Sequence, residues 1–165
     1  MRLVALTPAV MEALVAGDAV RASELVGVPV GDYLASEECA WLWRIRLEQA
    51  ARDPRAPGWT AGPAWALPDG PVVGHAGFHG PPDADGMVEI GYTVDPVFRR
   101  RGYGRAMVRA LLDRARLQPE VSRVRASIAP DNVASLGTIR GFGFTQVGEQ
   151  WDDEDGLEIL YEVEV

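Results

Sequence analysis

The spacing of hydrophobic residues along the chain predicts a mixture of strands and helices. Apolar runs with a period of two indicate strands, and apolar residues that recur every three or four positions indicate amphipathic helices. Glycine and proline clusters separate these segments, as at Gly27–Gly31 and Asp53–Pro63. The predicted strands span residues 2–6, 64–67, 72–78, 87–94, 123–128, 145–150 and 157–163, and the predicted helices span residues 8–26, 36–51, 103–117 and 132–140.

The middle of the chain carries the clearest pattern. In residues 87–94 the larger apolar side chains fall on one face, and Glu89 is the single charge on the other face. A helix and then a second strand follow this strand, which predicts a right-handed crossover between two parallel strands. Turn signals at Pro68-Asp69-Gly70 and at residues 152–156 predict antiparallel hairpins. Since no repeat or long linker divides the chain, residues 1–165 are expected to form one domain.

Composition and charge narrow the class of protein. The chain has 165 residues, 47% hydrophobic and 24% charged, which suits a single globular core. Its formal charge of −8 disfavours nucleic acid and anionic membranes as partners. All 16 basic residues are arginine, so lysine Schiff-base chemistry, lysine-anchored pyridoxal phosphate and a Walker P-loop are excluded. Nine of these arginines lie in residues 99–125, which makes one local basic segment.

The remaining composition indicates a cytoplasmic protein without a metal. Cys39 is the single cysteine, which rules out an intrachain disulfide and fits a reducing compartment. The longest stretch without a charged residue is 13 residues, too short to span a bilayer. Pro8 and Glu12 interrupt the apolar N-terminal run that would otherwise resemble a signal peptide. His75 and His79 have no third ligand at a suitable spacing, so we expect no metal site.

Residues 99–105, the Arg/Gly turn, form the most informative segment. They place three consecutive arginines and two glycines between a predicted strand and the start of a predicted helix. The first N–H groups of a helix lack internal acceptors, and the helix dipole is positive at that end. Glycine lets an anion approach the backbone closely, so this turn is expected to bind a phosphate or pyrophosphate.

Two spaced motifs carry a family resemblance. Arg99-x-x-Gly102-x-Gly104, preceded by residues 89–94 and Pro96, resembles the Gln/Arg-x-x-Gly-x-Gly/Ala acetyl-CoA motif of the GNAT N-acetyltransferases. Downstream, Asn132-x-x-Ser135 followed by Gly143-Phe144 resembles the next helix of that family. Together with Glu-Ile-Gly-Tyr at residues 89–92, these motifs most resemble the branch that contains the ribosomal-protein N-terminal acetyltransferases RimJ and RimL.

The resemblance implies a fold and a cofactor site. The implied fold is α/β (α+β): a mixed, mostly antiparallel twisted sheet of about six to seven strands, with helices on both faces and two splayed parallel strands at its centre. Pantetheine of acetyl-CoA would pair with the exposed strand edge at Val94, and the turn would hold the pyrophosphate. The side chains of Arg99 and Arg100 are the first candidates for phosphate contact, with Arg105 and Arg140 as weaker ones. The implied cofactor-binding residues are Val94, Arg99, Arg100, Arg101, Gly102, Tyr103, Gly104, Arg105 and Asn132.

The implied chemistry is direct acetyl transfer from acetyl-CoA to a primary amine. Glu89 is the candidate general base, directly or through water, and a main-chain N–H near Val94 is the candidate oxyanion donor. Many relatives carry a tyrosine seven residues after the motif asparagine, where this chain has Ile139. Resemblance to the RimL branch implies Ser135 as the candidate group to protonate or orient the thiolate. The spacing does not select between Tyr92 and Tyr33 as a substitute.

The acceptor and some side-chain roles stay open at this point. A protein N-terminus, a polyamine, an amino acid and a drug are all candidate acceptors, and a homodimer is one option for the oligomeric state. Alternatives are a catalytically silent acyl-CoA-binding or regulatory module and a protein-interaction domain. The acidic residues 152–155 are expected at a solvated hairpin tip that could repel anionic substrates. Four tryptophans are expected in the core, with residues near the first as candidates to line an acceptor pocket: Trp41, Trp43, Trp59 and Trp65.

Overall fold

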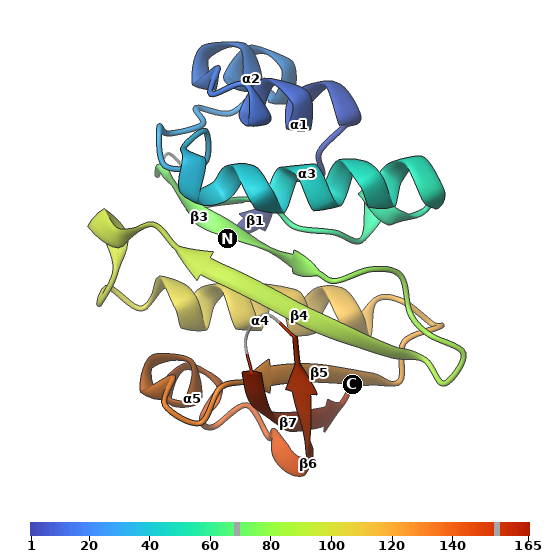
Figure 1. Ribbon diagram of the computed structural model, residues 1–165. Coiled ribbons are helices and arrows are strands. Elements are labelled where there is room, and N and C mark those ends of the chain that lie inside the picture. The colour runs from blue at the N-terminus through green and yellow to red at the C-terminus, as the bar shows by residue number, and fades with distance from the viewer. Residues whose placement is uncertain (68–69, 154–155) are drawn as a thin grey trace.

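A computed structural model describes residues 1–67, 70–153 and 156–165 (Figure 1). The strands are β1 (Arg2–Leu3), β2 (Gly62–Trp65), β3 (Val72–Phe78), β4 (Met87–Val94), β5 (Arg123–Ile128), β6 (Thr145–Asp152) and β7 (Gly156–Glu164). The helices are α1 (Pro8–Val15), α2 (Ala19–Val26), α3 (Glu37–Arg52), α4 (Tyr103–Arg116) and α5 (Val133–Ile139), with short 3-10 turns at Ala56–Gly58 and Pro96–Phe98. The strands form one sheet in the order β1-β2-β3-β4-β5-β7-β6. Only the β4–β5 pair is parallel among the described pairs, so the predicted mixed α/β fold is confirmed.

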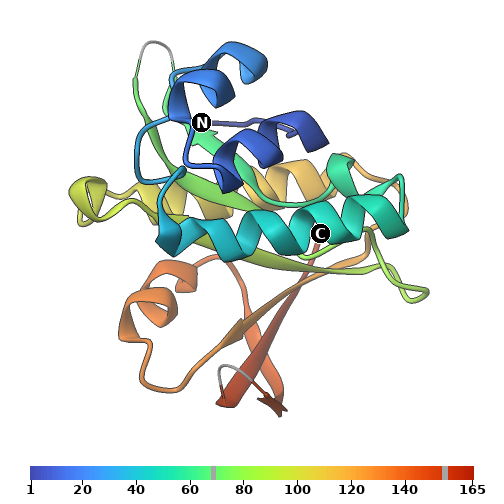
Figure 2. The ribbon, with the colours of Figure 1, turned by 45° about the horizontal axis from the view of Figure 1, so that its top comes forward.

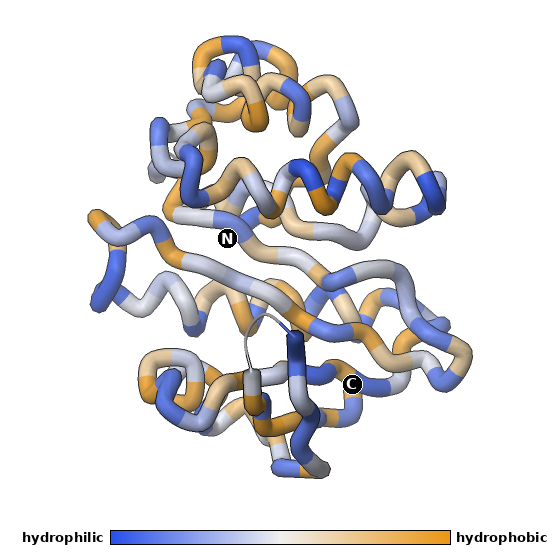
Figure 3. The backbone as a smooth tube through the Cα atoms, viewed as in Figure 1, coloured by the Kyte–Doolittle hydropathy of each residue, from blue (hydrophilic) through white to orange (hydrophobic). Residues whose placement is uncertain are grey.

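Helices pack on both faces of the sheet (Figure 2). Helix α4 buries the predicted apolar stripe, including Met107 and Leu111, against the strands. On the other face α1, α2 and α3 share a second apolar cluster that contains Leu14 and Trp43. Hydrophilic and hydrophobic residues alternate along α3, as expected for a helix with one covered face (Figure 3). None of the helices in the described ranges combines the length and the apolar character needed to cross a bilayer.

The predicted helix over residues 8–26 is wrong in one respect, because the structure divides it into α1 and α2. Gly17 adopts a φ of +75°, which a helix cannot continue through. The side chain of Asp18 then accepts a hydrogen bond from the N–H of Arg21 at 2.8 Å and starts the second helix. A Gly-Asp pair inside an otherwise periodic stretch therefore ends one helix and begins another.

The tryptophan prediction is also wrong in part. Trp43 is fully buried, and its indole N–H donates to the carbonyl of Leu34 at 2.7 Å. Trp41 is 53% exposed, because it lies on the opposite side of α3 from the buried face. Trp59 and Trp65 are half-buried at the margins of the two apolar clusters.

Two predicted turns lie partly outside the described residues. Strands β2 and β3 pair antiparallel as expected, but Pro68 and Asp69 of the predicted turn are not among the described residues. Strands β6 and β7 also form the expected antiparallel pair. Residues 154–155 of the acidic tip likewise lie outside the described residues.

Strands β4 and β5 splay apart and form a V at the centre of the sheet. Their parallel pairing covers only Met87–Glu89 of β4 against Arg123–Arg125 of β5. Beyond that point β4 continues to pair with β3 as far as Val94, whereas β5 continues to pair with β7 as far as Ile128. The edge of β4 that faces β5 is therefore unpaired from Ile90 onward, which confirms the predicted splay.

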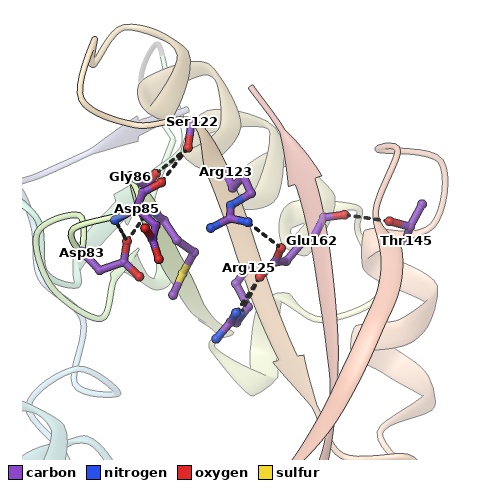
Figure 4. Close-up of polar contacts among 9 residues, drawn as sticks. Asp83, Asp85, Gly86, Ser122, Arg123, Arg125, Thr145 and Glu162 are labelled. Atoms are coloured by element: carbon purple, nitrogen blue, oxygen red, sulfur yellow. Dashed lines mark hydrogen bonds and ion pairs between the residues drawn. The ribbon is translucent and has the colours of Figure 1, made fainter.

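Polar side chains hold the closed end of the V together (Figure 4). Glu162 of β7 accepts hydrogen bonds from Arg125 at 2.6 and 3.0 Å and lies 3.9 Å from Arg123. The Ser122 hydroxyl donates to the carbonyl of Asp85 at 3.0 Å and so joins the loop before β4 to the start of β5. Ser122 thus ties β5 to the loop before β4 at the closed end, and Glu162 ties β5 to β7.

Candidate functional site

The chain leaves β4 at the open end of the V and enters the Arg/Gly turn, which leads into α4. Arg100 has a φ of +62° and Gly102 a φ of +83°, so the backbone adopts a left-handed conformation at two of three consecutive residues. The first helical hydrogen bond runs from the N–H of Ala106 to the carbonyl of Gly102 at 3.1 Å. The N–H groups of Tyr103, Gly104 and Arg105 precede it and have no acceptor within the helix. The helix start thus presents free N–H donors at its positive end.

The arginine side chains of the turn differ in their contacts. Arg99 donates from Nε to the carbonyl of Val94 at 3.1 Å, and the guanidinium of Arg101 lies 5.8 Å from the centre of the Phe98 ring. In the described part of the chain, no carboxylate forms an ion pair with any of the three consecutive arginines. Their positive charge at the helix start is therefore not neutralised by a neighbouring acid.

Arg105 has a different position from the one its motif suggests. Its Nη1 donates to the carbonyls of Thr138 and Arg140 at 3.0 and 2.7 Å, and its guanidinium lies 4.7 Å from the Phe142 ring centre. The side chain thus joins α4 to the end of α5. This leaves the backbone N–H of Arg105, rather than its guanidinium, for an anion at the turn.

A cavity of about 470 Å³, the central cavity, lies between α3 and the splayed strands. Helix α3, strands β3 to β7 and the start of α5 all contribute to its walls. Glu89 of β4 and Ser135 of α5, which are 46 positions apart in the sequence, both line it, together with Asn132 and Tyr92. The structure therefore brings both predicted catalytic residues into one cavity.

Glu89 lies in the wall of the cavity beside a histidine. Its side chain is 21% exposed, and its Oε1 is 3.6 Å from Nδ1 of His79. Desolvation lowers the pKa of His79 below its usual value, and the charge of Arg46 lowers it further, while the carboxylates of Glu89 and Glu158 oppose the shift. His79 is therefore neutral at pH 7, so Glu89 is not held there as one half of an ion pair with it.

Of the residues considered for protonation of the thiolate, Ser135 lines the cavity and Tyr33 does not. The Ile139 side chain is buried, as an apolar residue at that position should be. Asn132 accepts a hydrogen bond from the N–H of Ser135 at 3.0 Å, so it caps α5 and holds Ser135 in the first turn. The Tyr33 hydroxyl donates to Glu38 at 3.2 Å, and Tyr33 is not among the residues that line the cavity.

Tyr92 is the tyrosine that reaches the cavity. Its hydroxyl is buried without a hydrogen bond of good geometry, and Ser135 and Thr138 are the polar side chains nearest to it. Burial raises the pKa of Tyr92, an effect that its interactions with Ser135 and Thr138 partly offset. The phenol is thus protonated at neutral pH and adjacent to Ser135.

Sequence reasoning missed Arg46 and Glu158, which also line the cavity. Arg46 falls on the buried face of α3, at helical spacing from Cys39, Leu42 and Trp43. A charged residue at a position where the period requires an apolar one was the signal that could have identified it.

Residues 2–145 match the acetyltransferase (GNAT) domain. The chain belongs to the GNAT acetyltransferase family. This GNAT domain is 38% identical over 73 residues to the uncharacterized N-acetyltransferase YjdG of Bacillus subtilis strain 168. That match covers 44% of this chain and 44% of YjdG, so it spans less than half of the relative's length.

Solved structures agree with the GNAT fold over nearly the whole chain. A chimera of spermidine N-acetyltransferase SpeG from Vibrio cholerae with hSSAT is 12% identical, with a TM-score of 0.66 over 99% of this chain and 96% of the other. AAC(6')-Ib in complex with Parmomycin and AcetylCoA is 18% identical, with a TM-score of 0.62 over 99% of this chain and 91% of the other. At these identities the likeness supports the fold and leaves the acceptor undetermined.

Proposed function

We propose that residues 1–165 form one N-acetyltransferase domain that moves the acetyl group of acetyl-CoA directly to a primary amine. The observation that carries this proposal is the position of the free N–H groups of the Arg/Gly turn at the open end of the V, whose strands also line the cavity that holds Glu89. Membership of the GNAT family supports it. We further propose that the domain belongs to the RimJ/RimL-like branch and acts in the cytoplasm.

The residues of the turn and of β4 suit coenzyme A. The N–H groups of Tyr103, Gly104 and Arg105 would donate hydrogen bonds to the pyrophosphate, with Arg99, Arg100 and Arg101 supplying charge. The unpaired edge of β4 up to Val94 would pair with the amide groups of pantetheine, and Asn132 would contact it from α5. When bound, the cofactor supplies a thioester whose acetyl carbon is open to attack by an amine.

The residues of the cavity would then move protons. Glu89 takes a proton from the attacking amine, directly or through one water, as the C–N bond forms. An N–H group near Val94 stabilises the oxyanion. As the C–S bond breaks, Ser135 or the adjacent Tyr92 would supply a proton to the departing thiolate. The products are an N-acetylated amine and free coenzyme A.

The silent acyl-CoA-binding module is the second candidate. Ile139 in place of the usual tyrosine favours it, because the family's common proton donor is missing at that position. One experiment separates the enzyme from the silent module, because only the enzyme turns over an amine. Isothermal calorimetry measures coenzyme A binding, and thiol release from acetyl-CoA is followed with a panel of primary amines.

For an enzyme we expect coenzyme A to bind and at least one amine to release thiol. Glu89→Gln should bind coenzyme A as the wild type does and lose activity by about 100-fold or more, the usual share of a general base. Glu149→Gln, an exposed carboxylate of β6 outside the cavity, is the matched control and should not change the rate. Binding without turnover of any amine would support the silent module. No binding of coenzyme A would contradict both candidates.

A further inference from the structure

Arg46 is the single charged side chain that is buried among the described residues, at 7% exposure. Its Nη1 donates to Gln49 Oε1 at 2.8 Å and to the carbonyl of His79 at 3.2 Å. Its Nε is buried and has no acceptor. No carboxylate in residues 1–67, 70–153 and 156–165 forms an ion pair with it. The guanidinium is therefore buried with neutral partners only.

A buried cation without an anion is costly, and proteins rarely keep one without a use for it. Arginine stays charged in proteins, so the charge is not avoided by loss of a proton. The charge also acts inside the cavity, since it lowers the pKa of both His75 and His79. Arg46 lines the central cavity, which gives an incoming ligand a route to it.

The same cavity also contains negative charge. Glu89 lies 3.6 Å from the ring of His79, whose own carbonyl accepts the hydrogen bond from Arg46. His79 thus contacts both the guanidinium, through its carbonyl, and the candidate general base, through its ring. Glu158 of β7 lines the same cavity. A small molecule that neutralises both the guanidinium of Arg46 and the carboxylate of Glu89 carries an anionic group and a cationic group.

We propose that the acceptor is an amino acid or a similar small zwitterion, whose carboxylate binds Arg46 while its amine faces Glu89. This inference rests on the proposed acetyl transfer and narrows its acceptor. The planar guanidinium suits a carboxylate, which it can bind through two hydrogen bonds. A protein N-terminus has an amide in place of that carboxylate, and a polyamine has none, so both leave Arg46 unpaired.

Matched pairs of acceptors test the assignment, because each pair differs only in the carboxylate. Suitable pairs are histidine with histamine, tyrosine with tyramine, and lysine with cadaverine. Thiol release gives kcat/KM for each member, and we expect the amino acid of at least one pair to be preferred by about 10- to 100-fold. Arg46→Gln should reduce that ratio to near one, and Arg46→Lys should keep part of it. Arg44→Gln, an exposed arginine on the same helix, is the control and should preserve the ratio.

A purely structural Arg46 would change stability or all rates together and leave the ratio intact, which would overturn the assignment. Equal or better rates with every decarboxylated amine would also overturn it, and that comparison needs no variant. If no acceptor is acetylated, calorimetry on the coenzyme A-loaded protein measures the binding of both members of each pair and so tests the carboxylate site directly. Preferential binding of an amino acid without turnover keeps the carboxylate site and contradicts only the proposed catalysis. Equal binding of both members in every pair contradicts the site itself.

Discussion

His75 of β3 packs against α3, with its ring 5.7 Å from that of Trp43 and its Nδ1 buried without a partner. Burial and the charge of Arg46 lower the pKa of His75 from 6.5 to about 4. As the pH falls below 6.5, His75 therefore binds a proton in the unfolded chain, whereas in the folded chain it stays neutral down to about pH 4. Stability should fall as the pH falls through this window, by at most about 3 kcal/mol from this group.

Urea unfolding at several values between pH 7 and pH 4 measures this dependence. His75→Gln removes the titrating group, so the slope of the unfolding free energy against pH should become smaller in that window. His79→Gln is the matched control, because a ring that is 51% exposed contributes less. An unchanged slope in His75→Gln would show that this imidazole titrates normally in the folded protein.

The hydroxyl of Tyr92 provides a second test at the scale of a residue. A buried hydroxyl without a partner does not stabilise the fold, so Tyr92→Phe should leave the melting temperature unchanged or slightly raised. If the phenol protonates the thiolate, kcat should nevertheless fall by about 10-fold or more. Ser135→Ala made in parallel assigns the role, since the group that acts as the acid gives the larger loss. Full activity of both single variants and of the double variant would exclude both hydroxyls.

Among the elements, the pair β5–β7 contains Glu162 near the closed end of the V. The carboxylate compensates two arginines of β5 in half-buried surroundings. Glu162→Gln leaves those cations facing each other with a neutral partner, and we expect the unfolding free energy to fall by about 1–3 kcal/mol. Chemical denaturation measures this loss. Glu164→Gln, an exposed neighbour on the same strand, is the control. Equal stability of the two variants would mean that the ion pairs contribute nothing to the pairing of β5 with β7.

The elements also show what a sequence can predict. Strands 72–78, 87–94 and 123–128 occur as predicted, because their alternation reflects burial on each face of a sheet. The Arg/Gly turn was identifiable because its residues are contiguous. Arg46 was not identifiable in this way, because its position in the cavity depends on contact with His79, 33 positions away. The break at Gly17 escaped prediction because the apolar period continues across it.

At the scale of the whole molecule, the sheet has two halves that share only three residue pairs between β4 and β5. Strands β1 to β4 lie on one side of the V and β5 to β7 on the other, with the start of α4 and α5 beside its open end (Figure 1). A ligand that bridges the open end and the helix start stabilises both halves against unfolding. Coenzyme A at 100 times its Kd should add about 2.7 kcal/mol, which corresponds to a rise of roughly 5–10 °C in melting temperature for a chain of this size.

Differential scanning fluorimetry with and without coenzyme A measures this rise. The double variant Arg100→Glu with Arg101→Glu should lose most of it, because two negative charges then face the phosphates at the helix start. Arg21→Glu with Arg44→Glu makes the same change of charge on α2 and α3 and should keep the rise. Both double variants alter the net charge equally, so a general electrostatic effect would act on them alike. A loss confined to the first pair therefore locates the phosphates at the Arg/Gly turn, whereas an equal rise in both would place the ligand elsewhere.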